Sequence, residues 1–306
     1  MSDPNETIPL STLEYPDTIY QDQLQVRRQS QAADPNNPAW GLAGALLVWL
    51  VTILLQALLP PLFLIPYALN RGLNPGSPTF ARELLEFATS DRGAVFVQVL
   101  SILPIHILTF ALLWAFVTRL GKRPFLASLG WGRSGHLGFW SSVLLGIGLF
   151  IAASTLAKLL GAEKPTQLEQ LINSSLATRY MIAALAVFTA PFVEEFVYRG
   201  VLYSTLQRAI GVNGAVIFVL ALFTLIHVPQ YWPNVGVIAA VGLLSIVLTI
   251  VRAYCGRLLP CVVIHLVFNL IQAVVLVIEP YSQPMLPPTQ PAPAATVILQ
   301  LAHFIV

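Results

Sequence analysis

The sequence predicts an all-α fold, a polytopic membrane helix bundle with about 7–8 transmembrane helices. Of the 306 residues, 56% are hydrophobic and only 10% are charged, whereas soluble domains carry about 25% charged residues. The charges fall between uncharged stretches of about 20 residues or more, the length that crosses a bilayer as a helix. The composition therefore excludes a disordered chain and a soluble globular enzyme. The formal net charge of +2 also excludes a nucleic-acid binder with a broad basic face.

Residues 1–39 differ from the rest of the chain and are predicted to form a disordered cytoplasmic tail. Six of the 14 acidic residues lie here, among several Gln, Pro and Asn residues. Such polar segments bury too little apolar surface to fold alone. We expect no secretory signal, because no basic region followed by an apolar core is present.

Uncharged windows predict the positions of the spans. Three leading spans lie within residues 40–160 and the remaining ones within residues 180–278. The windows long enough for a single span are 41–70, 93–118, 137–157 and 258–278. A further apolar stretch covers residues 180–203, although it holds three charged residues.

Residues 209–251 are also uncharged, but this window is too long for one span. Two prolines within residues 228–234 predict a break there, because proline interrupts a helix. Two short helices joined by a loop with interfacial aromatics bring the count to seven spans. Residues 279–306 are predicted to form a proline-rich linker followed by a 13-residue apolar helix at 294–306. This helix is either an eighth, half-inserted span or a helix that lies at the membrane interface.

The distribution of Lys and Arg predicts the orientation. Ten of these residues fall on the side of the amino terminus and six on the other side. Because cytoplasmic loops carry an excess of basic residues, we expect an integral protein of the cell's inner membrane with a cytoplasmic amino terminus.

The span at residues 180–203 contains Glu194, Glu195 and Arg199. Ionisable groups inside a span are costly and therefore indicate function. The four-residue spacing predicts that Glu195 pairs with Arg199 on one helix face. Glu194 lies about 100° away from that face and has no intrahelical cation. It is therefore the free carboxyl that general acid–base chemistry needs. The alternative is a packing network without chemistry.

Two histidines lie in apolar stretches of other spans. His227 ends residues 223–227, and His265 lies one helical turn before Asn269 on the same face. Glu195 and His227 are each 16 residues from Gly211, which places both roughly 24 Å from a turn there. His265 is only about 10 Å along its span. It reaches the same level only if the preceding loop is sunk into the bundle or the helices tilt.

The alternative for each histidine, and the expectation for His106, is an interhelical hydrogen bond without catalysis.

These motifs resemble a known family, the CPBP intramembrane proteases, which include the type II CAAX prenyl proteases and the Abi, bacteriocin-immunity-type proteins. The family pattern is Glu-Glu-x-x-x-Arg, then Phe-x-x-x-His, then His-x-x-x-Asn or Asp, each on a membrane helix. This chain has all three in that order, at residues 194–199, 223–227 and 265–269. The resemblance covers about residues 180–275.

The resemblance implies an endopeptidase within the membrane that acts on a membrane-tethered or prenylated protein. Glu194 would activate a water molecule, and His227 would assist that water. His265 and Asn269 would hold the oxyanion of the tetrahedral intermediate, as preorganised donors in a dry site do.

The resemblance further implies that Glu195 and Arg199 shape the site. The family is described both as metallo- and as glutamate-type proteases. No cofactor is certain from the sequence, and Zn²⁺ held by Glu194, His227 and His265 stays open, since one carboxylate and two imidazoles leave a position for water.

Two other functions remain alternatives: a non-catalytic immunity or scaffold protein of the same fold, and an ion-coupled transporter. Membrane lipids are the other expected partner, and the basic residues between Arg119 and Arg133 fit contact with anionic lipid.

Overall fold

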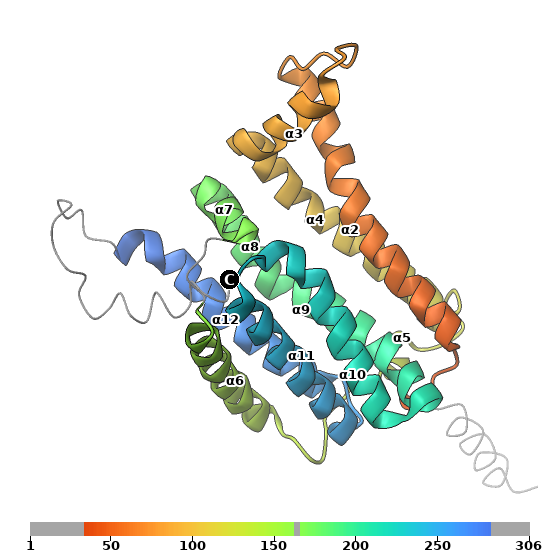
Figure 1. Ribbon diagram of the computed structural model, residues 1–306. Coiled ribbons are helices and arrows are strands. Elements are labelled where there is room, and N and C mark those ends of the chain that lie inside the picture. Colours follow the sequence, from red (N-terminus) through yellow and green to blue (C-terminus); the bar gives the residue numbers. More distant parts are fainter. Residues whose placement is uncertain (1–33, 162–165, 283–306) are drawn as a thin grey trace, which may run out of the picture. The chain divides into compact units, whose positions relative to one another are not determined.

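The computed structural model describes residues 34–161 and 166–282 (Figure 1). Of the predicted tail, residues 1–33 lie outside the described residues, as do residues 283–306 with the predicted carboxy-terminal helix. Every regular element in the described ranges is a helix, as predicted. In chain order the helices are α2 (Leu42–Asn70), α3 (Phe80–Ser90), α4 (Arg92–Thr118), α5 (Phe125–Ser128), α6 (Phe139–Leu159), α7 (Gln167–Ser174), α8 (Leu176–Phe188), α9 (Ala190–Glu195), the π-helix η2 (Phe196–Leu202), α10 (Tyr203–Tyr231), α11 (Val235–Cys255) and α12 (Leu259–Ser282).

Six stretches of these ranges are long and apolar enough to cross a membrane. One of them, Leu176–Tyr231, has 56 residues and runs through α8, α9, η2 and α10. It contains a bend at Gly211, where φ is 76° and ψ is 170°. Only glycine adopts this backbone conformation readily. The bend lies at the turn predicted there, and the two limbs on either side of it correspond to two of the seven predicted spans.

The predicted break at residues 228–234, between the fifth and sixth predicted spans, begins later than expected. The α10 helix continues through Pro229 and ends at Tyr231, so residues 228–231 are helical. Pro229 removes one backbone donor but does not stop the helix. The interruption comes at Trp232, whose extended conformation (ψ 136°) is the one that a following proline favours. Helix α11 then begins after Asn234, whose side chain accepts a hydrogen bond from the amide of Val237.

Helices α10, α11 and α12 form the centre of the bundle, with α6 packed against α11 and α12. In the most apolar window of α11, 56% of the residues are buried, against 17% for α2. The exposed face of α2 carries leucines such as Leu47 and Leu58, each 60% exposed. Exposed leucines of this kind are stable in contact with the acyl chains of lipids. Together with the six long apolar helices, they indicate an integral membrane protein.

Two amphipathic helices outside the spans, α3 and α7, were not predicted by the uncharged windows. The α7 helix begins with a capping box: Thr166 accepts from the amide of Glu169, and Glu169 accepts from the amide of Thr166. Such caps satisfy the free amides at a helix start. Both helices lie at the end of the bundle where α2 ends and α8 begins.

The described end of the amino-terminal segment, residues 34–40, is held against the opposite end of the bundle. Arg252, itself fully buried, donates to Asn36 Oδ1 at 2.9 Å and to the carbonyl of Pro35 at 3.0 Å. Trp40 donates from Nε1 to the carbonyl of Val201 in η2 at 3.3 Å. This segment therefore ties the start of α2 to the π-helix.

Candidate active site

The charged residues of α9 and η2 meet inside the bundle. Glu195 and Arg199 are both 0% exposed, and Arg199 Nη1 donates to Glu195 Oε1 at 3.0 Å. This confirms the ion pair predicted from their spacing. The π-helix begins directly after Glu195 and contains Arg199. Such wide turns are rare and occur often at functional sites.

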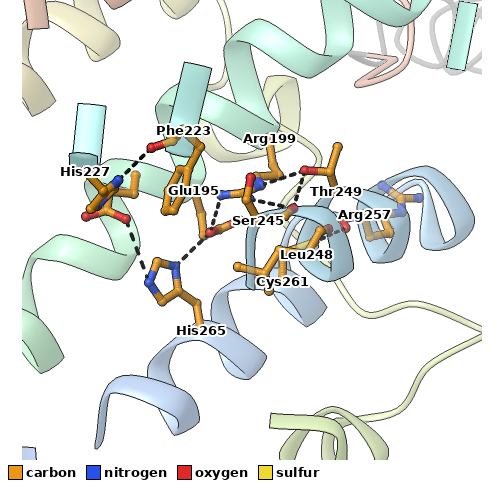
Figure 2. Close-up of polar contacts among 11 residues, drawn as sticks. Glu195, Arg199, Phe223, His227, Ser245, Leu248, Thr249, Arg257, Cys261 and His265 are labelled. Atoms are coloured by element: carbon orange, nitrogen blue, oxygen red, sulfur yellow. Dashed lines mark hydrogen bonds and ion pairs between the residues drawn. The ribbon is translucent and has the colours of Figure 1, made fainter. Parts of the chain in front are cut away.

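Helix α11 supplies the remaining partners of the Arg199 guanidinium. Nη2 donates to the carbonyl and the hydroxyl of Ser245 at 2.9 and 3.1 Å, and Nε donates to Thr249 Oγ1 at 3.3 Å. The Phe223 ring packs against the guanidinium, with 4.8 Å between the ring centroid and Cζ of Arg199. Figure 2 shows Glu195 on one side of Arg199 and the two hydroxyl residues on the other. Buried cations need such complete pairing, because desolvation is costly.

His265 of α12 contacts the same carboxylate. Its Nδ1 lies 2.8 Å from Glu195 Oε1, and the ring is 2% exposed. Because an ion-paired carboxylate only accepts, Nδ1 carries the proton in this contact. The other ring nitrogen, Nε2, lies 3.8 Å from Glu194 Oε2. Glu195 therefore orients His265 so that its second nitrogen faces Glu194.

The level of His265, which the sequence left undecided, follows from the loop before α12. Leu258 is fully buried, and its amide donates to the carbonyl of Gly130 at 2.9 Å. The start of α12 is thus packed against the loop at Gly130, although Arg257, just before it, is exposed. This brings His265 to Glu195 although it lies early in its helix.

The two adjacent glutamates have different surroundings. The side chain of Glu195 is fully buried and accepts from Arg199 and His265, whereas that of Glu194 is 23% exposed. The closest cationic or imidazole group that the structure pairs with Glu194 is the Nε2 of His265. Glu194 is thus the accessible carboxyl of the pair.

His227 lies beside these residues on α10. Its Nδ1 is 2.7 Å from the carbonyl oxygen of Phe223. Since a carbonyl can only accept, Nδ1 is the donor, and in the neutral ring Nε2 is left unprotonated. The Phe223 ring lies 4.6 Å from the His227 ring and 6.5 Å from the His265 ring. The phenylalanine of the Phe-x-x-x-His pattern therefore lies near both histidines.

Asn269 is the sixth candidate residue and lies one turn after His265. Its Nδ2 donates to the carbonyl of Ala186 in the last turn of α8 at 2.9 Å. The amide has a second N–H, so one donor remains beyond this contact.

Comparison with known proteins bears on this part of the chain. Residues 176–271 match the family model described as type II CAAX prenyl endopeptidase Rce1-like. This segment is similar to Rce1-like CAAX proteases, and we refer to it as the Rce1-like domain. No curated protein and no solved structure matches the chain.

The Rce1-like domain contains all six candidate residues, and the geometry divides them. Glu194, Glu195, Arg199 and His265 form a connected set, whereas Asn269 contacts α8. His227 is joined to that set through the ring of Phe223.

Sequence reasoning missed Ser245 and Thr249, which hold Arg199. Their signal was present: two hydroxyl residues four apart on one face of an otherwise apolar span. It also missed Trp49 of α2, outside the Rce1-like domain, whose Nε1 donates to the hydroxyl of Tyr198 at 3.0 Å.

The zinc site left open by the sequence was tested against the donor set. Among residues 34–161 and 166–282, no group of three or more His, Cys, Asp and Glu side chains is arranged to hold a metal ion. Glu194, His227 and His265 therefore do not fit a metal centre as they stand, and no step below passes through a metal.

Proposed function

We propose that this protein is an intramembrane endopeptidase that hydrolyses a peptide bond in a membrane-tethered or lipidated protein. The observation that carries the proposal is the contrast between the adjacent glutamates. Glu195 is committed to Arg199 and His265, while Glu194 is accessible and faces His265 Nε2 at 3.8 Å. This arrangement leaves one carboxyl free for proton transfer within a fixed polar frame.

In the proposed reaction Glu194 accepts a proton from a water molecule as the water oxygen bonds to the carbonyl carbon of the substrate. His227 Nε2, left unprotonated by the contact of Nδ1 with Phe223, accepts the second hydrogen bond of that water and orients it. The electron pair of the carbonyl moves to its oxygen. When the intermediate collapses, the C–N bond breaks and Glu194 returns the proton to the leaving amine.

The oxyanion needs donors where its charge develops. Because the Nδ1–H of His265 is donated to Glu195, the proposed donors are the second N–H of Asn269 and the Nε2–H of a protonated His265 ring. Support comes from the fixed orientation of both side chains, Asn269 by Ala186 and His265 by Glu195. Arg199 holds Glu195 in place and does not itself meet the substrate.

The substrate class follows from the family. The matched model is named for CAAX prenyl endopeptidases, so a prenylated carboxy-terminal peptide is the first substrate to test. We further propose that the amino terminus is cytoplasmic and the protein resides in the cell's inner membrane, because the end of the bundle near residues 34–40 gathers most of the arginines.

The test compares Glu194→Gln with Glu86→Gln, an exposed glutamate on α3. We expect Glu194→Gln to lower the cleavage rate of a lipidated reporter by about 100-fold or more, with Glu86→Gln equal to wild type at matched amounts. Equal cleavage by all three would overturn the proposal. A biological effect that survives both Glu194→Ala and His265→Ala would instead indicate a scaffold. Substrate flux in vesicles that depends on Glu194 would indicate a transporter.

A further inference from the structure

His106 is a buried histidine of α4, outside the segment that matches the family model. It is 6% exposed, and its Nδ1 lies 2.7 Å from the hydroxyl of Thr189. Thr189 is the single residue between α8 and α9, with φ −129° and ψ −45°. The contact therefore joins a leading helix to the break that precedes the helix of Glu194.

The direction of this hydrogen bond follows from the partners of Thr189. The threonine hydroxyl also lies 3.1 Å from the carbonyl of Leu185, which can only accept. Its one proton goes to that carbonyl, so the hydroxyl oxygen accepts from His106. Nδ1 of His106 therefore carries a proton, and in the neutral ring Nε2 does not.

The backbone closes the break between α8 and α9 only in part: the amide of Thr189 donates to the carbonyl of Leu185 at 3.2 Å, and its carbonyl accepts from the amide of Val193 at 3.1 Å. Pro191 has no amide hydrogen, so the regular helical bond to the carbonyl of Val187 is missing. The preceding carbonyl, of Ala186, accepts from Asn269 of α12. Side chains of α4 and α12 thus hold the break from two directions.

The position of this break sets the position of the carboxylate. Glu194 lies five residues after Thr189, about 7.5 Å along the helix axis. A rotation or shift of the six-residue helix α9 would move Glu194 relative to His265. The ion pair of Glu195 with Arg199 restrains the end of α9 that holds Glu194, and the contact of Thr189 with His106 restrains its start.

We propose that His106 is a positioning residue for this protease: its hydrogen bond to Thr189 fixes the start of α9 and with it the Glu194 carboxylate. The inference rests on the proposed function. It gives the leading helices, which lie outside the Rce1-like domain, a direct role in the geometry of the site.

The test measures kcat and KM in nanodiscs for four single variants and for the double variant His106→Ala/Thr189→Val. His106→Ala and Thr189→Val each remove the bond, and His106→Asn keeps a donor at the place of Nδ1. Thr109→Val is the matched control, since Thr109 is a buried α4 threonine whose hydroxyl has no partner in the described part of the chain.

We expect His106→Ala and Thr189→Val to lower kcat by about 10- to 100-fold with little change in KM, because small misplacements of reacting groups are that costly. The double variant should be no worse than either single one. His106→Asn and Thr109→Val should stay within about twofold of wild type.

Wild-type kcat in both His106→Ala and Thr189→Val would overturn the proposal. So would loss in His106→Asn with full activity in Thr189→Val, because His106 would then act through its ring and not through Thr189.

A second readout does not need cleavage. In NMR spectra of protein labelled with ¹⁵N-histidine, the His106 signal, identified by its loss in His106→Ala, should show protonation at Nδ1 only, and Thr189→Val should change that signal. If the signal behaves so while wild type cleaves no substrate, the proposed function fails and the hydrogen bond stands. If Thr189→Val leaves the His106 signal unchanged, the positioning role fails even in an active protease.

Discussion

Glu195, Arg199 and His265 form the most completely buried polar group of the candidate site. One carboxylate oxygen of Glu195 accepts from both Arg199 and His265. Removing one member of a buried ion pair leaves an uncompensated charge, which typically costs about 3–5 kcal/mol. We therefore expect Arg199 to act mainly on the stability of the fold. It acts on the candidate site indirectly, by holding Glu195 in place.

The corresponding prediction concerns Arg199→Met. This variant keeps the apolar part of the side chain but leaves Glu195 without its cation, so we expect the free energy of unfolding to fall by about 3 kcal/mol. Thermal denaturation in detergent measures it. The control is Arg82→Met on α3, whose side chain is 72% exposed and whose loss should matter by less than about 1 kcal/mol. An unchanged melting temperature in Arg199→Met would contradict the account.

The hydroxyl residues Ser245 and Thr249 give a finer prediction. Thr249→Val removes one acceptor of Arg199 and keeps the shape of the side chain. We expect a loss of about 1–3 kcal/mol in the free energy of unfolding, since the guanidinium then has an unmet N–H. The same measurement on Thr109→Val should show no comparable loss. Equal effects of the two valines would refute the assigned role of Thr249.

Single elements of the bundle depend on local backbone features that hydropathy does not record. The bend at Gly211 lies in a conformation reserved for glycine, and no atom lies within 4 Å of the place that a Cβ would take. A substitution there is therefore opposed by the backbone alone. This allows conformational strain to be separated from steric overlap.

We expect Gly211→Ala to destabilise the protein by about 1 kcal/mol or more, because alanine does not adopt this φ readily. Gly148→Ala is the matched control: it lies within α6, also without neighbours around a Cβ, where alanine favours the helix. Thermal denaturation of both variants checks the difference. A loss in Gly148→Ala equal to that in Gly211→Ala would contradict the assignment.

Uncharged windows predicted the long apolar helices well, since length and hydropathy define a span. They could not predict the break at Thr189 or the π-helix after Glu195, because both depend on hydrogen bonds made by single residues. The motif residues were identified from the sequence. The level of His265 was left open there, because it depends on how α12 packs against its neighbours, which the sequence does not record.

At the scale of the whole molecule, the basic residues that predict orientation lie toward the two ends of the bundle. The end near residues 34–40 holds several arginines, of which Arg119, Arg208 and Arg252 donate to that segment. The arginines that predict orientation thus also have a structural task. We expect this end to lie in the cytoplasm, because cytoplasmic loops carry an excess of basic residues.

Cysteine labelling tests the orientation. The natural residues Cys255 and Cys261 are buried, so a membrane-impermeant maleimide should react little with the parent protein. In intact cells we expect Arg82→Cys on α3 to be labelled and Arg123→Cys to be protected until the membrane is permeabilised. The reverse pattern would place the amino terminus outside.

The most direct test of the central claim is cleavage by purified protein. Wild type and Glu194→Gln, matched for amount and melting temperature, are incubated in nanodiscs with lipidated peptides, with and without a chelator, and the products are identified by mass spectrometry. The account predicts one defined cleavage by wild type, unaffected by the chelator, and a loss of about 100-fold or more in Glu194→Gln. Equal cleavage by the two proteins would contradict it.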